Sequence, residues 1–431
     1  MVESSNWFQT ALVYASLAAF GMPYVELIIV TIGELWFHAA FRTDEKKYKK
    51  LIIQITTLGK EQERVIEIIA RIHSYYLPMD YQIWVVLEPG FPTDYDGADC
   101  VYVVPEDFSC LARAKARALE YSHRIREENG ISFDATLKLL FLDDDVEPTR
   151  EYVMAGFAGD YDICQGITAP RISYGNHGFK HFLLSHMDDM RLLTCLVWCS
   201  FAQGVLKRPV YAHGEGLFMT ARAERIVTWN YKIFASEDLV VGQNAANLGL
   251  CWGWFHEYVE LTSPWTRSDY IKQRRRWLWG NLHALGHQGI LPIWGRVFVA
   301  GRHILGPTTA VLSVAGIGAI ATHTLHPTGF LLMYCQGALV TWLLAFFVAG
   351  WVNAGRRDPL VKRSPAHFFV NRLWQSLAAM VLAALLITPT WTIASLIVCL
   401  FKGNPRGFET IAKTAKSSSA ARATQTLARD A

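Results

Sequence analysis

Three consecutive carboxylates, Asp143 to Asp145, directly follow the apolar segment 137–142. An apolar run of this length predicts a buried strand, so Asp143 and Asp145 are expected just beyond a strand end and facing one way. Carboxylate oxygens suit a hard divalent cation, and a cation held there could bridge two phosphates of a sugar nucleotide. The alternative is an acidic turn that caps a helix beginning near Pro148.

A second acidic pair, Glu237 and Asp238, follows Ser236. A carboxylate at this position could act as a general base on an acceptor hydroxyl, and Asp238 is the candidate, with Glu237 beside it. The alternative is purely structural, because acidic side chains are favoured at a helix N-terminus by the helix dipole.

The stretch 273–277 reads Gln-Arg-Arg-Arg-Trp and precedes the hydrophobic C-terminal third of the chain. Guanidinium groups bind phosphate oxygens through two parallel hydrogen bonds, and an indole face packs on the apolar face of a sugar ring. The pattern therefore indicates sugar transfer from a nucleotide donor near a membrane. The alternative is a cationic helix whose long side chains reach to the membrane surface.

The elements that must position these residues alternate between strands and helices. We expect strands at 51–57, 81–87, 100–104 and 137–142, with helices at 64–73 and 110–124. This order predicts an α/β, Rossmann-like domain with a mostly parallel, doubly wound sheet. Ligands of such sheets bind at the carboxyl ends of the strands, which is where Thr57, Glu88 and Asp143 are expected.

The composition excludes several classes of protein. Of the 431 residues, 52% are hydrophobic and only 18% are charged, against about 25% charged in soluble domains, so part of the chain is expected in lipid. A net charge of +3 argues against nucleic acid as a partner. The eight cysteines show no Cys-x-x-Cys spacing and hence no zinc pattern or disulfide framework, which agrees with a reducing compartment.

Hydrophobic stretches flank the α/β domain at both ends. The nearly uncharged stretch 8–37 is long enough to span a membrane, and the basic residues after it place the following domain in the cytoplasm. Apolar runs at 303–322 and 329–352 predict two more spans. The last run, 373–402, is either one long span or a hairpin with its tip at 388–390, and the basic tail favours the hairpin.

The resulting domain plan is that of an integral protein of the cell membrane. Its parts are an N-terminal transmembrane segment at 1–42, a cytoplasmic catalytic domain at 43–285, an interfacial helix region at 286–302, transmembrane segments at 303–403 and a partly disordered cytoplasmic tail at 404–431.

Several short stretches together resemble one enzyme family. They are Lys115–Leu119, Gln165-Gly166, Ser263–Thr266 and Tyr270–Leu278, in addition to the two acidic clusters. The chain resembles the membrane-bound, inverting family 2 glycosyltransferases of GT-A fold, which include cellulose, chitin and hyaluronan synthases. Within that family it is most similar to the egghead-type β-1,4-mannosyltransferase branch.

The resemblance implies a role for each matching residue. Asp143 and Asp145 would hold Mg²⁺ or Mn²⁺ on the donor diphosphate, Asp238 in its Glu237-Asp238 motif would be the catalytic base, and Trp277 would frame the acceptor. The donor nucleotide would be held by Thr57, Glu88, Lys115, Asp143, Gln273 and Arg276, although many family members have Asp where this chain has Glu88. The segment His213-Gly214-Glu215 lies where the family forms part of the acceptor pocket, or else is a simple glycine-rich turn.

The implied reaction is one in-line displacement that inverts the anomeric carbon and forms a β-glycoside. The donor implied is GDP-mannose or UDP-glucose, and the acceptor is a hydroxyl of a lipid-linked or growing glycan in contact with membrane lipid. A processive polysaccharide synthase that extrudes its polymer shares every one of these motifs and stays open. A transporter or scaffold is disfavoured, because the only acidic residues in the stretch 8–37 are Glu26 and Glu34.

Overall fold

The structure is a computed structural model of the whole chain. It describes residues 7–37, 41–44, 46–171, 186, 188–209, 212–264, 266–286, 291–301, 306–322, 329–357 and 365–403. The tail at 404–431 and most of the loop at 322–327 lie outside the described residues, as do parts of the region at 286–302.

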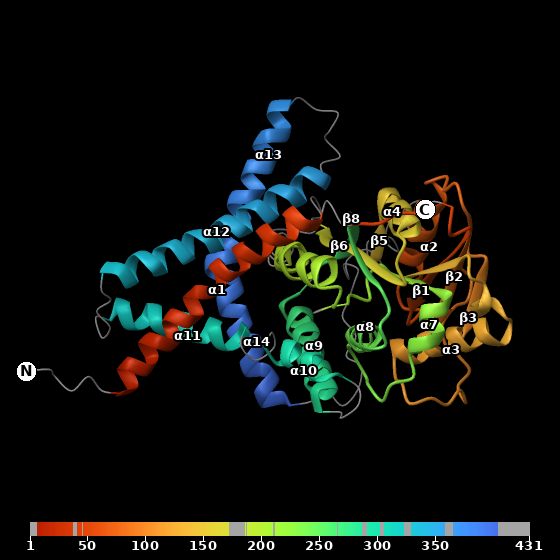
Figure 1. The fold of residues 1–431 in the computed structure, drawn as a ribbon, viewed down its shortest axis with the longest axis horizontal. Coiled ribbons are helices and arrows are strands. Elements are labelled where there is room, and N and C mark those ends of the chain that lie inside the picture. The colour runs from red at the N-terminus through yellow and green to blue at the C-terminus, as the bar shows by residue number, and fades with distance from the viewer. Residues whose placement is uncertain are drawn as a thin grey trace, which may run out of the picture.

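One eight-stranded sheet forms the centre of the α/β part (Figure 1), in the order β3-β2-β1-β4-β7-β6-β8-β5. Its strands are β1 (Lys50–Thr57), β2 (Asp80–Leu87), β3 (Cys100–Val103), β4 (Leu137–Asp143), β5 (Val146–Pro148), β6 (Ile163–Arg171), β7 (Leu217–Thr220) and β8 (Trp252–Thr262).

The four strands predicted from the sequence are confirmed as β1 to β4, and they pair in parallel. Strand β7 runs antiparallel to both β4 and β6, and β5 runs antiparallel to β8 at the edge. The sheet is therefore mixed but mostly parallel, since β6 and β8 also pair in parallel.

Helices cover both faces of this sheet, because alternate residues of each strand point to opposite sides. Leu51, Ile53 and Ile55 of β1 pack in a core with the apolar face of α2 (Gln62–His73) and with α4 (Arg150–Ala158). On the other face Ile52 packs in a core that includes residues of α3, α7 and α8. The helices of this part are α3 (Lys115–Glu128), the short 3-10 turn η1 (Ile131–Phe133), α6 (Asp189–Thr194), the π-helical segment η2 (Cys195–Val205), α7 (Ala221–Val227), α8 (Glu237–Asn247), α9 (Arg267–Gly286) and α10 (Ile293–Ala300). Helix α3 begins at Lys115, five residues after the predicted start at Cys110.

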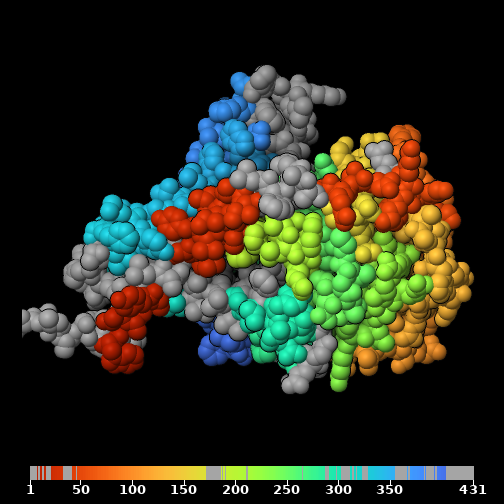
Figure 2. Space-filling model, in the orientation of Figure 1, coloured from red at the N-terminus to blue at the C-terminus, as the bar shows by residue number. Residues whose placement is uncertain are grey.

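The remaining helices gather beside the sheet and form the other half of the molecule (Figures 1 and 2). They are α1 (Trp7–Phe37), α11 (Gly306–Ala321), α12 (Gly329–Arg357), α13 (Pro365–Ala378), the π-helical segment η5 (Ala379–Ile387) and α14 (Thr388–Lys402). Helix α1 contacts α11, α12 and η2, so the N-terminal helix packs against helices from the C-terminal third and touches the α/β part.

The preferred hairpin in the last apolar run is wrong. Helical backbone continues without a break from Pro365 through η5 to Lys402, across the proposed tip at 388–390. Proline lacks the N–H of a helical hydrogen bond, and a π-helical turn beside it can absorb the disturbance. The sequence Thr-Pro-Thr therefore lies within one long helical rod rather than at a turn.

One helix among the described residues is long and apolar enough to cross a membrane by length and composition, Gly329–Ala354 within α12. Shorter apolar helical stretches occur at Gly21–Ile32 in α1 and at Arg191–Val205.

Candidate active site

The carboxyl ends of β1 and β4 bring a threonine and the acidic run together. These strands are parallel neighbours, and Thr56 is paired with Asp143. The Thr57 hydroxyl donates to Asp144 Oδ2 at 2.7 Å and accepts from the backbone N–H of Gly59 at 2.9 Å. Asp144 is thus buried and hydrogen-bonded to Thr57, whereas Asp143 and Asp145 are both partly exposed.

Lys115 joins the two acidic clusters. It is the first residue of α3, and its ammonium group forms an ion pair with Asp143 and lies 3.5 Å from Glu237 Oε1. Burial alone would lower the pKa of Lys115, but the carboxylates of Asp143, Glu237 and Asp238 outweigh burial and raise it. A cation at a helix N-terminus opposes the helix dipole, so this lysine is held in place by its acidic partners.

Glu237 and Asp238 occupy the first turn of α8, the helix N-terminus that the sequence offered as the structural alternative. The backbone N–H of Gly214 donates to Asp238 Oδ2 at 2.7 Å. A Cβ at Gly214 would overlap the Lys115 ammonium group, so a larger residue here would require the lysine to shift. Ala114 and Ser236, which directly precede Lys115 and Glu237, have left-handed φ values of 52° and 63°. Such strain in non-glycine residues is typical of functional sites.

Asp238 has the chemistry of a base that works near neutral pH. Burial, the negative charge of Glu237 and that of Glu215 together raise its pKa to about 7, while Lys115 acts in the opposite direction. The side chain still keeps part of its surface open to solvent. A carboxylate with this pKa can accept a proton and release it again at physiological pH.

The segment 212–216 forms one wall of the site. Its backbone is fixed by the buried amide of Gln165, which donates to the His213 carbonyl at 2.7 Å and accepts from its N–H at 3.1 Å. Glu215 pairs with Arg191, and the Arg191 guanidinium lies 5.1 Å from the centre of the Trp277 ring. Burial acts to raise the pKa of Glu215, but Arg191, His213 and Lys115 outweigh it and lower that pKa to about 2.

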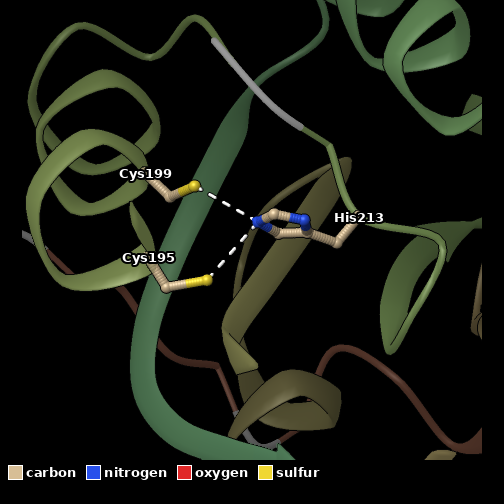
Figure 3. A group of neighbouring side chains, drawn as sticks. All are labelled: Cys195, Cys199 and His213. Atoms are coloured by element: carbon tan, nitrogen blue, oxygen red, sulfur yellow. Dashed lines mark hydrogen bonds between the residues drawn. The ribbon is translucent and has the colours of Figure 1, made fainter. Parts of the chain in front are cut away.

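His213 also contacts two cysteines of η2. Its Nε2 lies 3.4 Å from Cys195 Sγ and 3.3 Å from Cys199 Sγ, and both thiols point at the ring nitrogen (Figure 3). From their spacing in the sequence, the cysteines were expected to form no zinc pattern, and this group of three was not foreseen. The two thiols lie one helical turn apart and the histidine comes from a separate loop, so no short spacing reveals the cluster.

The contacts unite most of the predicted residues but not all. One network that includes Arg191 holds eight of the predicted residues: Asp143, Lys115, Glu237, Asp238, Gly214, Glu215, His213 and Trp277. Glu88 differs, because its carboxylate pairs with Arg117 of α3 at 2.5 Å. Gln273 and Arg276 lie on α9, the helix that carries Trp277.

Two charged residues of the site were not predicted. Arg191 stands between Glu215 and Trp277, and Asp188, which is fully buried, accepts from Arg274 Nη2 at 3.0 Å. The sequence places three charged residues just before the apolar segment of η2: Asp188, Asp189 and Arg191. This cluster is the feature from which their role could have been predicted.

Comparisons with known proteins show what the fold and the sequence are similar to. A solved mannosyltransferase from Pyrobaculum calidifontis, in complex with GDP-Man and Mn²⁺, superposes with a TM-score of 0.51 at 13% identity, covering 91% of this chain and 100% of that one. The likeness shows a shared GT-A-like fold.

Curated relatives match over part of their length. The chain is 25% identical over 224 residues to β-1,4-mannosyltransferase egh of Drosophila melanogaster, which is 50% of this chain and 47% of that protein. It is also 25% identical over 178 residues to β-1,4-mannosyltransferase bre-3 of Caenorhabditis elegans, which is 40% of this chain and 38% of that one. The chain thus spans about half or less of these relatives. The model of glycosyl transferase family group 2 matches residues 139–401, well over half of the chain. The chain therefore belongs to glycosyl transferase family group 2.

Proposed function

We propose that the protein transfers mannose from GDP-mannose to a hydroxyl group of a lipid-linked acceptor, with inversion at the anomeric carbon. The observation that carries the proposal is the partly exposed Asp238, whose pKa of about 7 suits a general base. The choice of mannose is supported by the β-1,4-mannosyltransferases among the relatives, and the choice of GDP by the solved neighbour that holds GDP-Man.

The residues present fit a divalent cation. Asp143 and Asp145 offer oxygen ligands of the kind that Mg²⁺ and Mn²⁺ prefer. Asp143 and Glu237 share one ammonium group, that of Lys115, so carboxylates outnumber this cation here. We infer that Asp143 and Asp145 would hold Mg²⁺ or Mn²⁺, which when bound would neutralise charge on the donor diphosphate.

The chain's own residues can perform the remaining tasks. Asp238 takes the proton of the acceptor hydroxyl, and the backbone N–H groups of Gly214 and Leu239 each donate to one of its carboxylate oxygens and so orient the group. Thr57, Glu88 and Lys115 help to hold the nucleotide. The Gln273 amide oxygen is buried and, among the described residues, lacks a hydrogen-bond partner. A buried polar group in this state suits a ligand, so Gln273 and Arg276 are assigned to the donor side.

Trp277 and the segment His213-Gly214-Glu215 are assigned to the acceptor side. The indole ring of Trp277 has Arg191 at 5.1 Å and Arg274 at 4.6 Å from its centre. These cations fix the plane of the ring, which would pack against the acceptor sugar. A single displacement requires one base and no carboxylate nucleophile, so an α-linked donor gives a β-glycoside.

The membrane is proposed as the place where the acceptor is met. Helix α12 is long enough to span a bilayer, and it packs with α1, α13 and α6. We place the catalytic domain at the cytoplasmic face of the cell membrane, because the basic residues that follow α1 favour the cytoplasmic side. In this orientation the active site faces the cytoplasm, where it would meet the nucleotide sugar.

Nucleoside diphosphate release by the detergent-purified protein tests the proposal. GDP-mannose and UDP-glucose are compared with Mn²⁺, with Mg²⁺ and with EDTA, in the presence and absence of a membrane lipid extract. Metal-dependent release from GDP-mannose that lipid stimulates, with one sugar added to a lipid product, supports the proposal. A high-mass product formed without lipid supports a processive synthase instead, and release from neither donor by folded protein overturns both.

A further inference from the structure

The cluster of Cys195, Cys199 and His213 lies outside the carboxylate centre and has the composition of a soft-metal site. The two thiols are fully buried, and the ligand atoms of all three side chains lie within 4.8 Å of one another (Figure 3). Sulfur and imidazole ligands select Zn²⁺ over Mg²⁺ or Mn²⁺, which prefer oxygen.

The distances match a tetrahedral metal ion. Zn–S bonds of about 2.3 Å and Zn–N bonds of about 2.0 Å place sulfur and nitrogen about 3.5 Å apart across a tetrahedral angle. Here Nε2 of His213 lies 3.4 Å from one sulfur and 3.3 Å from the other. One ion placed between them would replace the two sulfur–nitrogen hydrogen bonds without large movement of any side chain.

The surroundings orient the ligands as an outer layer of a metal site does. The Thr168 hydroxyl lies 2.9 Å from Cys195 Sγ and can donate to a thiolate. The backbone of His213 is fixed on both sides by the buried Gln165 amide. Both supporting residues belong to β6, so the sheet holds the loop and the helix against each other.

We propose that Cys195, Cys199 and His213 bind one Zn²⁺ ion, which fastens the segment 212–216 to helix η2. Binding releases the thiol protons to solvent and leaves the fourth tetrahedral position for water. The role we assign to the ion is to hold these two segments together. Its ligand His213 directly precedes Gly214, whose N–H donates to Asp238. The next residue, Glu215, pairs with Arg191. Loss of the ion would therefore loosen the wall of the carboxylate centre.

Metal analysis of the reduced protein, purified without a histidine tag or chelator, tests the proposal directly. About one zinc per chain is expected, with loss of at least ten-fold in occupancy in Cys199→Ser. The matched control is Cys164→Ser, a buried thiol of β6 that lies 3.6 Å from the Gly156 carbonyl and outside the cluster. This control should keep its zinc. Zinc that stays bound in Cys199→Ser would place the ion elsewhere and overturn the site.

Cobalt titration keeps the proposal testable where a variant fails to fold. Wild-type protein freed of metal and titrated with Co²⁺ should develop thiolate-to-cobalt charge-transfer absorption, and added Zn²⁺ should abolish it. Absence of both bound zinc and this absorption, in reduced and folded protein, overturns the proposal. Neither readout depends on glycosyl transfer, so failure of the proposed function would leave this result unchanged.

A melting experiment examines the structural role. Removal of zinc should lower Tm, and Zn²⁺ but not Mn²⁺ should restore it, because Mn²⁺ is a poor ion for sulfur ligands. Recovery with Mn²⁺ alone would assign the effect to the carboxylates and not to this cluster.

Discussion

Helix α3 takes part in two ionic networks that differ in their balance of charge. At its start Lys115 lies among Asp143, Glu237 and Asp238, where carboxylates outnumber cations. About three turns further along, Arg126 binds Glu224 through two nitrogen atoms, in a group that also contains His123.

The Arg126–Glu224 pair of the second network has its hydrogen-bond partners within the protein. Arg126 Nη1 also donates to Gln54 at 2.6 Å, and the Trp229 indole N–H donates to Glu224 at 3.0 Å. Burial acts to raise the pKa of Glu224, but Arg126 and His123 outweigh it and lower that pKa to about 2. A buried ion pair with this many hydrogen bonds fixes the packing of α3 on α7.

The first network is left unbalanced, and this is what distinguishes a site for chemistry. Asp238 has a pKa of about 7 because burial and neighbouring acids act against its charge. Helix α3 thus supplies Arg126, which neutralises Glu224 in the second network. It also supplies Lys115, which only partly offsets the acidic cluster of the first. The contrast predicts that mutations in the first network change catalysis, and mutations in the second change stability.

Replacement of Asp238 by Asn should have the largest effect. Loss of a general base lowers kcat by about 10²- to 10⁴-fold, while donor binding, measured by calorimetry, should stay within about three-fold. Because the folded-state pKa of Asp238 exceeds its ordinary 3.8, ionisation costs stability that grows from pH 4 to pH 7. The Asn variant should therefore melt higher than wild type at pH 8 and no higher at pH 4. Retained turnover would remove Asp238 from the role of base.

Replacement of Glu224 by Gln should do the reverse. It leaves Arg126 buried without its anionic partner, which costs about 3–5 kcal/mol of unfolding free energy. Denaturant unfolding should show this loss, while kcat per folded molecule stays near wild type. Because the pKa of Glu224 is lowered in the fold, its contribution is present above pH 4.5 and is lost as pH falls towards 2. The deficit of the variant should shrink accordingly in acid. A large loss of kcat at full stability would contradict the contrast.

The fold could be predicted further than the site. The first four strands and the position of the acidic run after β4 follow from uninterrupted apolar segments, because a strand buried on both faces has no polar alternation. The antiparallel β7 was not predicted, since its four residues are too short to carry a pattern. The turn expected at 388–390 failed because a proline beside a π-helical segment can stay inside a helix.

Site residues that belong to motifs were predicted, and those assembled by tertiary contacts were not. Asp143 stands out after a strand and Asp238 in an acidic pair, whereas Lys115 was implied by the family resemblance. The structure brings all three together. Arg191 and the thiols of Cys195 and Cys199 reach the site from a different helical segment. Their distance in sequence from His213 and Glu215 leaves no local signal, and only the folded chain reveals them.

Replacement of Lys115 by Met should change the pH dependence of catalysis. Lys115 favours the ionised form of Asp238, so its removal raises the pKa of that carboxyl above about 7. The acidic limb of kcat/KM should move to higher pH, and activity at pH 7 should fall roughly ten-fold for every pH unit that the limb moves. Part of the activity should return at alkaline pH. Lys115→Arg, which keeps the charge, should hold the limb near its wild-type position, and an equal movement of the limb in both variants would speak against a charge effect.

Replacement of Glu215 by Gln should move the same limb in the opposite direction by a smaller amount. Its negative charge raises the pKa of Asp238, but Arg191 neutralises part of it, so the limb should move towards acid by less than about one pH unit. The variant should keep more of its maximal kcat/KM than wild type at pH 6. Asp160→Asn, which removes an acid paired with Lys47 at the surface, is the control and should leave the profile unchanged. Opposite movements of the limb in Lys115→Met and Glu215→Gln can arise only if one titrating group feels both charges, so movements in the same direction would show that the limb does not belong to Asp238.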